Sequence, residues 1–212
     1  AYNALVMYEG AIIVTEPDTG RILALVSKPD FDPNTISEVW DDLVNDSNSS
    51  VLVNRATQGL YPPGSTFKIL TALEYIRENP LTYQNYSFNC NGRFTSGEDT
   101  IRCFHGTKHG KVDFTTSFAK SCNSSFANMG LTLSRTSFED TLSSLYFNQS
   151  LPVDLTSNIS KVSIGTSSSD SDLIQTVIGQ GTTQMTPLHL SMITSMIANH
   201  GIMMQPYIID RV

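Results

Sequence analysis

The chain has 212 residues, which is enough for one domain or two small ones. Its formal net charge of −7 disfavours a nucleic-acid binder, because such a protein needs a basic face to follow phosphates. Its longest apolar runs, Ala11 to Val14 and Ile22 to Val26, are far shorter than the roughly 20 residues of a membrane-spanning helix, and its first residues do not resemble a signal peptide.

A β-hairpin is the first predicted element. The strand Gly10–Thr15 and the return strand 21–27 flank a turn at 16–20, in which Gly20 permits a positive φ. Both strands are dense in apolar residues, so we expect both faces of the hairpin to be buried.

The next part of the chain is predicted to contain two helices. Residues 28–50 are expected to be a solvated, loop-rich stretch with one helix over about Ile36 to Leu43. The second helix is predicted over Thr66 to Arg77, directly after two prolines, because prolines are excluded from a helix interior. Ser65 therefore lies at the N-terminus of this helix. Residues 82–111 are expected to be irregular.

More helices are predicted in the second half of the chain. Asp113 is placed to cap one over 114–120, and two more are expected over 124–133 and 137–145. The Ser-rich stretch 154–172 is expected to be a mobile loop.

The last predicted helix covers 188–199, with Thr186 as its N-cap. One stripe of this helix is apolar, and it is formed by Leu188, Met192, Ile193, Met196 and Ile197. Upstream of it, Gly179 and Gly181 are expected to form a tight turn rather than a phosphate loop, because the lysine and hydroxyl of a phosphate loop are missing.

The motif that carries chemistry is Ser65-Thr66-Phe67-Lys68. A Ser and a Lys at i and i+3 share one face of a helix, where a neutral lysine amine can take the serine proton and activate the hydroxyl. Burial lowers the pKa of a lysine, which makes this role feasible. The helix N-terminus adds N–H groups that favour a developing oxyanion.

This spacing alone carries little weight. With 26 Ser and 6 Lys in 212 residues, about 0.7 matches to Ser-x-x-Lys are expected by chance, and two occur. Ser65 follows Pro-Pro-Gly at a helix start. Ser117, in the second match Ser117–Lys120, lies inside a predicted helix, so we interpret it as structural.

A second motif is Ser121-Cys122-Asn123, between two predicted helices. A hydroxyl and a carboxamide two residues apart can relay a proton and hold a peptide amide. Taken by itself, the tripeptide is better explained as an ordinary helix–helix turn.

Four segments occur in a distinctive order: Gly10–Ser27, then Asn54–Lys68 with its ending Tyr-Pro-Pro-Gly-Ser-Thr-Phe-Lys, then Ser121–Asn123, then Ile178–Pro187. Together they resemble the transpeptidase domain of a class B penicillin-binding protein over nearly the whole chain. The resemblance implies an α/β (α+β) fold, with an antiparallel sheet flanked by helices and a mostly helical subdomain. It implies an enzyme of the serine-type D-Ala-D-Ala transpeptidase/carboxypeptidase class, whose serine β-lactams also acylate.

The resemblance also implies roles for individual residues. Ser65 would be the acylated nucleophile, Lys68 its general base, Ser121 a proton relay, and Asn123 the residue that holds the substrate's peptide amide. No cofactor is implied. The implied partners are peptidoglycan stem peptides, β-lactam antibiotics and a cell-wall synthesis complex. The implied location is the extracytoplasmic face of a bacterial membrane, with the anchor outside this chain.

One departure from the family pattern is the absence of a Lys-Thr-Gly motif from all 212 residues. We therefore expect residues 1–212 to be a transpeptidase domain truncated before the strand that carries this motif, with an incomplete sheet. Two alternatives remain open. One is a β-lactamase or β-lactam sensor on the same fold, and the other is a catalytically incomplete scaffold or binding domain.

The three cysteines are a separate feature. Cys90 and Cys103 are either a disulfide or free thiols, because the sequence does not supply their separation. Cys122 is interpreted as a free thiol of the core or cleft. A metal site built from Cys90, Cys103, His105 and His109 is disfavoured, since the Cys-Phe-His spacing is tight and no Cys-x2-Cys pair occurs. No metal ligand is assigned.

Overall fold

The computed structural model describes residues 1–47 and 49–210, which form two compact units. The first unit comprises residues 1–61, 149–160 and 185–210, and the second comprises 62–148 and 161–184. In the described part of the chain, no helix combines the length and the apolar character needed to cross a membrane.

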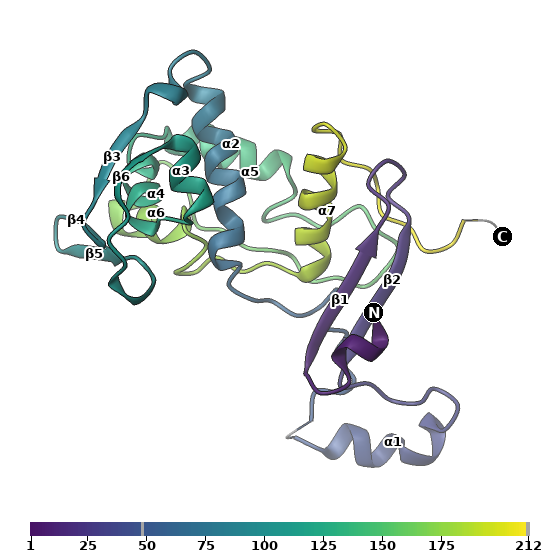
Figure 1. The fold of residues 1–212 in the computed structure, drawn as a ribbon. Helices are drawn as coiled ribbons and strands as arrows, with labels where there is room; N and C mark the ends of the chain where they lie inside the picture. Colours follow the sequence, from purple (N-terminus) through teal and green to yellow (C-terminus); the bar gives the residue numbers. More distant parts are fainter. Residues whose placement is uncertain (48, 211–212) are drawn as a thin grey trace. The chain divides into compact units, whose positions relative to one another are not determined.

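The first unit contains the predicted hairpin (Figure 1). β1 (Gly10–Thr15) and β2 (Ile22–Lys28) pair antiparallel, with Gly10 opposite Lys28. Gly20 has a positive φ of 82° in the connecting turn, as its sequence context predicts. The hairpin prediction is confirmed.

The expectation that both faces of the hairpin are buried is wrong. Val14 is 42% exposed and Leu23 is 57% exposed, whereas Ile22 is buried. The helix α7 (Pro187–Ala198) lies beside β1, and among the described residues no third strand joins the pair. A two-stranded sheet with one covering helix leaves part of its apolar surface exposed to water.

The α-helices α1 and α7 of the first unit begin within one residue of the predicted starts. The Thr186 hydroxyl caps α7 by accepting the His189 N–H at 3.2 Å. Four residues of the predicted apolar stripe are buried: Leu188, Met192, Ile193 and Met196. The fifth, Ile197, is 44% exposed, because it lies at the edge of the stripe near the helix end. α1 (Ile36–Asn45), which buries none of its side chains, and a 3-10 helix (Tyr2–Leu5) complete the elements of this unit.

The second unit contains two small antiparallel sheets. β3 (Ser87–Cys90) pairs with β6 (Gly110–Asp113), and β4 (Arg93–Ser96) pairs with β5 (Asp99–Arg102). The expectation that residues 82–111 are irregular is therefore wrong. Each strand has only four residues, of which at most two are apolar, so no apolar run marks the strands in the sequence.

The described part of the second unit also contains five α-helices. They are α2 (Lys68–Glu78), α3 (Phe114–Ala119), α4 (Asn123–Gly130), α5 (Arg135–Ser144) and α6 (Asp170–Thr176), with 3-10 helices at Gly64–Phe67, Tyr83–Asn85 and Phe104–Gly106. Asp113 caps α3 as predicted, accepting the Thr116 N–H at 2.6 Å. The first four α-helices confirm the predicted ones within a few residues. The helix α6 is not predicted, because it starts at a capping box of Ser169 and Asp172 inside the stretch 154–172 that was expected to be a loop.

Buried side chains connect α2 and the residue before it to α5 and the segment that follows α5. Phe67 packs edge-on against Phe147, with ring centroids 5.7 Å apart. Glu74 is fully buried on α2, and its carboxylate accepts hydrogen bonds from Arg77 and from the Thr141 hydroxyl of α5. The described elements confirm the expected α/β class with antiparallel strands.

Gly179 allows a close approach between the turn at 179–181 and the start of the Ser65 helix. The Gly64 N–H donates to the Gly179 carbonyl at 2.9 Å, and Gly179 has a φ of 71°. A Cβ on Gly179 would lie 2.1 Å from the Gly64 carbonyl oxygen. The two segments can meet in this way because residue 179 has no side chain.

Gly179→Ala should therefore destabilise the protein more than an ordinary glycine replacement does. Gly97→Ala is the matched control, because Gly97 has a φ of 58° but nothing lies within 4 Å of an added Cβ. The control carries only the left-handed backbone strain, about 1 kcal/mol, whereas Gly179→Ala adds the clash. In thermal unfolding followed by circular dichroism, we expect a melting temperature several degrees lower for Gly179→Ala than for Gly97→Ala. Equal melting temperatures would contradict the close approach.

Candidate active site

The amine of Lys68 lies at the centre of the predicted site. Its Nζ is 3.0 Å from Ser65 Oγ, 2.9 Å from Ser121 Oγ and 2.5 Å from Asn123 Oδ1. It also lies 2.9 Å from the Ser121 carbonyl oxygen, 53 residues further along the chain. The structure thus brings the other three residues singled out from the sequence to the nitrogen atom of Lys68.

The contact between Ser65 and Lys68 follows from local structure. The 3-10 helix Gly64–Phe67 follows two prolines and runs directly into α2, which begins at Lys68. Residues three apart in a 3-10 turn lie one above the other, so the two side chains share one face. Ser65 is exposed, whereas Lys68 is only 2% exposed. The hydroxyl is therefore open to a substrate while the amine is enclosed.

Burial changes the protonation of Lys68. Removal of its ammonium from water lowers the pKa from the ordinary 10.5 to about 8, although the nearby Cys122 and Cys103 thiols act in the opposite direction. Near pH 8, neutral Lys68 is therefore well populated, whereas an ordinary lysine stays protonated.

The oxygen atoms around Lys68 determine what its neutral form can do. A neutral amine has two N–H donors and one lone pair. The Asn123 Oδ1 and the Ser121 carbonyl oxygen can only accept hydrogen bonds, so they take both N–H groups. The lone pair is then left for a hydroxyl, and Ser65 Oγ is within reach at 3.0 Å. This arrangement can remove the proton of Ser65.

The turn between α3 and α4 holds Ser121 and Asn123 in place. Ser121 has a φ of 49°, in the left-handed region that residues other than glycine rarely adopt. The Asn123 Nδ2 donates to the Arg102 carbonyl at 3.0 Å, which orients the amide so that Oδ1 faces Lys68. The role of Arg102 is not predictable from the sequence, since a backbone carbonyl leaves no signal in the side-chain pattern.

The other Ser-x-x-Lys match forms no comparable arrangement. Ser117 is fully buried, donates to the Asp113 carbonyl at 2.6 Å and lies 2.7 Å from Ser125 Oγ. Lys120 is exposed. The interpretation of Ser117 as structural is consistent with these contacts.

A second group of side chains surrounds Cys122. The ligand atoms of Cys90, Cys103, His109 and Cys122 all lie within 4.8 Å of one another. All three cysteines are buried free thiols, and the Cys90 and Cys103 sulfurs are 3.6 Å apart, so the structure favours the free-thiol alternative. The metal set considered from the sequence included His105, which is not in this group, and omitted Cys122, which is. Sequence spacing missed the group because its members follow no familiar ligand pattern.

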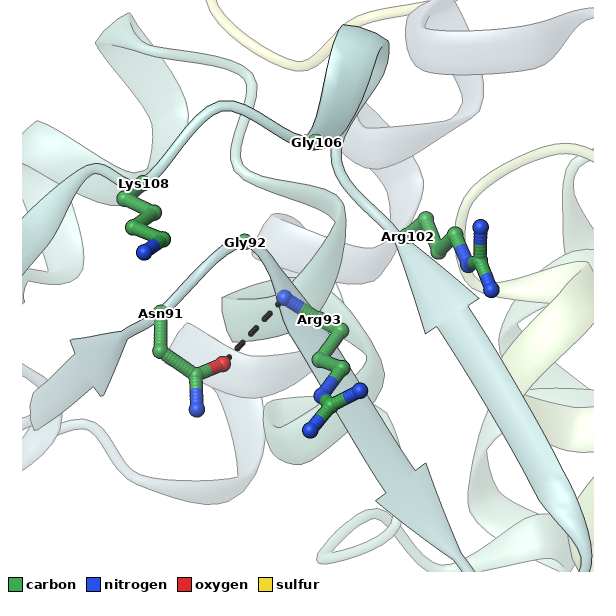
Figure 2. A pocket seen from close by; sticks show the side chains of 6 residues that line it. All are labelled: Asn91, Gly92, Arg93, Arg102, Gly106 and Lys108. Carbon is green, nitrogen blue, oxygen red and sulfur yellow. Dashed lines mark hydrogen bonds between the residues drawn. The ribbon is translucent and has the colours of Figure 1, made fainter.

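A cavity of about 480 Å³ opens beside β4 and β5. Figure 2 shows the residues that line it: Asn91, Gly92, Arg93, Arg102, Gly106 and Lys108. Three of these side chains are cationic. Arg102 links this cavity to the Lys68 site, because its carbonyl accepts the hydrogen bond from Asn123.

Comparison with known proteins identifies the family. Residues 10–212 match the family model of the penicillin-binding protein transpeptidase domain. The chain is 30% identical over 212 residues to the peptidoglycan D,D-transpeptidase PbpA of Mycobacterium tuberculosis, covering 95% of this chain and 43% of that protein. The chain thus spans less than half the length of this curated relative.

Solved structures with the same fold support this assignment. The penicillin G acyl-enzyme complex of penicillin-binding protein A from M. tuberculosis is 29% identical, with a TM-score of 0.82 over 94% of this chain and 48% of that one. The complex between PBP2 and MreC from Helicobacter pylori contains a match of 27% identity, with a TM-score of 0.84 over 94% of this chain and 39% of that one. The class B resemblance is confirmed, and the chain belongs to the penicillin-binding protein transpeptidase domain family.

Proposed function

We propose that this chain carries the acylation machinery of a peptidoglycan D,D-transpeptidase. The convergence of Ser65, Ser121 and Asn123 on the buried amine of Lys68 is the observation that carries the proposal. Two comparisons support it: the name of the M. tuberculosis relative, and the penicillin G acyl-enzyme complex of M. tuberculosis penicillin-binding protein A. Because the chain covers less than half of that relative, the proposed activity is that of the protein containing this chain.

In this proposal, residues 1–212 belong to one penicillin-binding transpeptidase domain. They supply the Ser-x-x-Lys and Ser-x-Asn motifs of the site, whereas Lys-Thr-Gly does not occur among them. The strand carrying that third motif would come from outside this sequence and complete the cleft.

Acylation would begin when Ser65 Oγ attacks the carbonyl carbon of the penultimate D-Ala of a stem peptide. Lys68 Nζ takes the hydroxyl proton as the new C–O bond forms, and N–H groups at the helix N-terminus favour the oxyanion. The C–N bond to the terminal D-Ala then breaks. The Ser121 hydroxyl, 2.9 Å from Lys68 Nζ, passes the proton on to the leaving amine.

Deacylation would transfer the acyl group to an amine of a neighbouring stem peptide. The amine attacks the Ser65 ester, and an amide bond forms as the C–O bond breaks. The proton that the amine loses passes through Lys68 to Ser65 Oγ. A β-lactam forms the same ester by opening its ring C–N bond, but its leaving amine remains attached.

Asn123 would bind the substrate with the part of its amide that Lys68 does not use. Its Oδ1 accepts from Lys68, and one N–H of its NH₂ group donates to Arg102. An amide NH₂ has a second N–H, which we assign to a peptide carbonyl of the stem peptide.

The proposed substrate also determines the location and partners. Stem peptides lie outside the cytoplasmic membrane, so we place the domain at its extracytoplasmic face. A cell-wall synthesis complex is the proposed setting, by analogy with the H. pylori PBP2 that is solved together with MreC.

Ser65→Ala should abolish labelling of the protein by a fluorescent penicillin, because Ser65 supplies the attacking oxygen. Ser117→Ala, which changes the other Ser-x-x-Lys motif, should leave labelling intact. Denaturing gel electrophoresis measures the label, and peptide mass spectrometry should place it on Ser65. Persistent labelling of Ser65→Ala would refute the assignment. Repeated turnover of a chromogenic cephalosporin would favour a β-lactamase, and absence of any label would favour a scaffold.

The rate of acylation by penicillin should rise with pH and level off above about pH 8. The lowered pKa of Lys68 means that the amine is protonated and inactive as a base below this value, and neutral above it. Stopped-flow acylation measured between pH 6 and pH 10 tests this. A rate independent of pH in this range would exclude Lys68 as the titrating base.

Asn123→Asp should move the midpoint of this pH profile upward. The substitution places a negative charge about 2.5 Å from the Lys68 amine, which stabilises the protonated form and raises its pKa by at least about one unit. Asn128→Asp is the matched control, because Asn128 lies on the same helix and contacts Tyr86 instead of Lys68. Equal midpoints for the two variants would contradict direct contact between Asn123 and Lys68.

A further inference from the structure

We propose that the cationic cavity beside β4 and β5 binds a carboxylate of the stem peptide, upstream of its D-Ala-D-Ala end. The cavity has a volume of about 480 Å³, and its lining includes Arg93, Arg102 and Lys108. This inference rests on the proposed function, because it concerns a further part of the same substrate. Ser65 and Lys68 would act on the D-Ala-D-Ala end, whereas the cavity would recognise a negative charge elsewhere on the peptide.

Two arginines lie directly opposite each other on β4 and β5. Arg93 pairs with Arg102 in the strand register, and both residues are exposed. Residues in such a pair have their Cβ atoms about 5 Å apart on one face, where like charges destabilise the strand pair. Thr95 and Thr100, the next pair on this face, instead lie 3.1 Å apart in a hydroxyl hydrogen bond. A bound anion would explain why two positive charges occupy the arginine positions.

The protein does not neutralise these charges with its own carboxylates. Within the described part of the chain, none of the salt bridges includes Arg93, Arg102 or Lys108. The acidic residues nearest in sequence, Glu98 and Asp99, lie at the opposite end of the β4–β5 pair, and Asp99 accepts a hydrogen bond from Ser171 Oγ at 2.9 Å. The three cations are therefore available to an anion from outside the protein.

The positive charge of this region contrasts with the charge of the whole chain. Residues 90–123 contain five Lys or Arg residues and three Asp or Glu residues, whereas the chain has a net charge of −7. A concave site lined by one sign of charge concentrates ligands of the opposite sign. A long polyanion would be repelled by the acidic remainder of the chain. The site therefore suits a single carboxylate on a small ligand.

Two glycines keep the cavity open between the cations. A Cβ on Gly92 would lie 2.4 Å from the Gly106 carbonyl oxygen, so the two backbones meet closely. Nothing lies within 4 Å of an added Cβ on Gly106, so the space beside it is free. Figure 2 shows Lys108 on one side of Gly92, with Arg93 and Arg102 on the other. A carboxylate in this space could accept two N–H groups from a guanidinium.

The connection between Arg102 and Asn123 favours the stem peptide as the ligand over an acidic partner protein. The Arg102 carbonyl accepts one N–H of Asn123 at 3.0 Å, and the other N–H is the one that we assign to a peptide carbonyl of the substrate. An extended peptide advances about 3.3 to 3.6 Å per residue. A carboxylate on one of the residues just before D-Ala-D-Ala would therefore come within reach of the Arg102 side chain.

The first test compares synthetic peptides that end in D-Ala-D-Ala and contain Glu or Gln at one of the three preceding positions. Each peptide competes with a fluorescent penicillin for Ser65, in the protein purified with the flanking sequence that its gene encodes. At one position or more, the Glu peptide should compete about 3- to 10-fold better than its Gln counterpart, which is the effect of one or two partly exposed ion pairs. Equal competition at all three positions would overturn the proposal.

Arg93→Gln should remove most of the preference for the Glu peptide, because it takes one guanidinium from the cavity. Lys111→Gln is the matched control, since Lys111 is an exposed cation on β6 that does not line the cavity. The preference should stay at its wild-type value in this control. A preference that survives Arg93→Gln, or that falls equally in both variants, would show that the carboxylate does not bind in the cavity.

Arg93→Glu should stabilise the protein without peptide while it removes the preference. The new carboxylate would lie opposite Arg102, where it replaces a repulsive pair with an attractive one. We expect a melting temperature about 1 to 4 °C above that of the wild type. A purely structural role for Arg93 predicts the opposite, a loss of stability. An unchanged or lower melting temperature would therefore remove the basis of the proposal.

Failure of this proposal and failure of the proposed function give different results. Normal penicillin labelling of Ser65 with equal competition by the Glu and Gln peptides would overturn the carboxylate site alone, and an acidic partner protein would then be the better candidate ligand. Absence of labelling would overturn the proposed function. In that case, saturation-transfer NMR with the same peptides measures binding directly. Stronger binding of a Glu peptide would support the carboxylate site, and equal binding would overturn it.

Discussion

The enclosure of the Lys68 amine by oxygen acceptors is the constraint on which the site depends. A lysine that is 2% exposed must satisfy its nitrogen from within the protein, and Ser65, Ser121 and Asn123 provide the partners. The same burial lowers its pKa to about 8, which turns an ordinary cation into a usable base. The burial of Lys68 therefore explains both its hydrogen-bond partners and its lowered pKa.

Several backbone contacts of the second unit hold the residues around the Lys68 amine in place. Gly179 lets its turn contact the backbone beside Ser65, and the Arg102 carbonyl fixes the amide of Asn123. Ser121 adopts a left-handed conformation that costs about 1 kcal/mol and persists only because its surroundings hold it. The buried thiols of Cys90, Cys103 and Cys122 lie next to these contacts, because Cys122 separates Ser121 from Asn123 and Cys103 follows Arg102.

Elements with strong local signals were predicted well. The hairpin of β1 and β2, the Asp113 cap and the helix entry at Ser65 each depend on residues adjacent in sequence. The four-residue strands between Ser87 and Asp113 were missed, because their stability depends on partners across the unit rather than on their own pattern. The helix α6 was missed because its serine-rich start resembles a loop.

The sequence by itself indicated the family and named Lys68 and the three residues around it, because ordered motifs can be recognised without coordinates. Spacing alone did not distinguish the two Ser-x-x-Lys matches. The position of Ser65 after Pro-Pro-Gly, at the start of a helix, distinguished it from Ser117. Only the tertiary structure showed that Ser65 is exposed beside a buried lysine while Ser117 is enclosed. Only tertiary structure gathered Cys122 with Cys90, Cys103 and His109, because a site made of distant residues exists only after the chain folds.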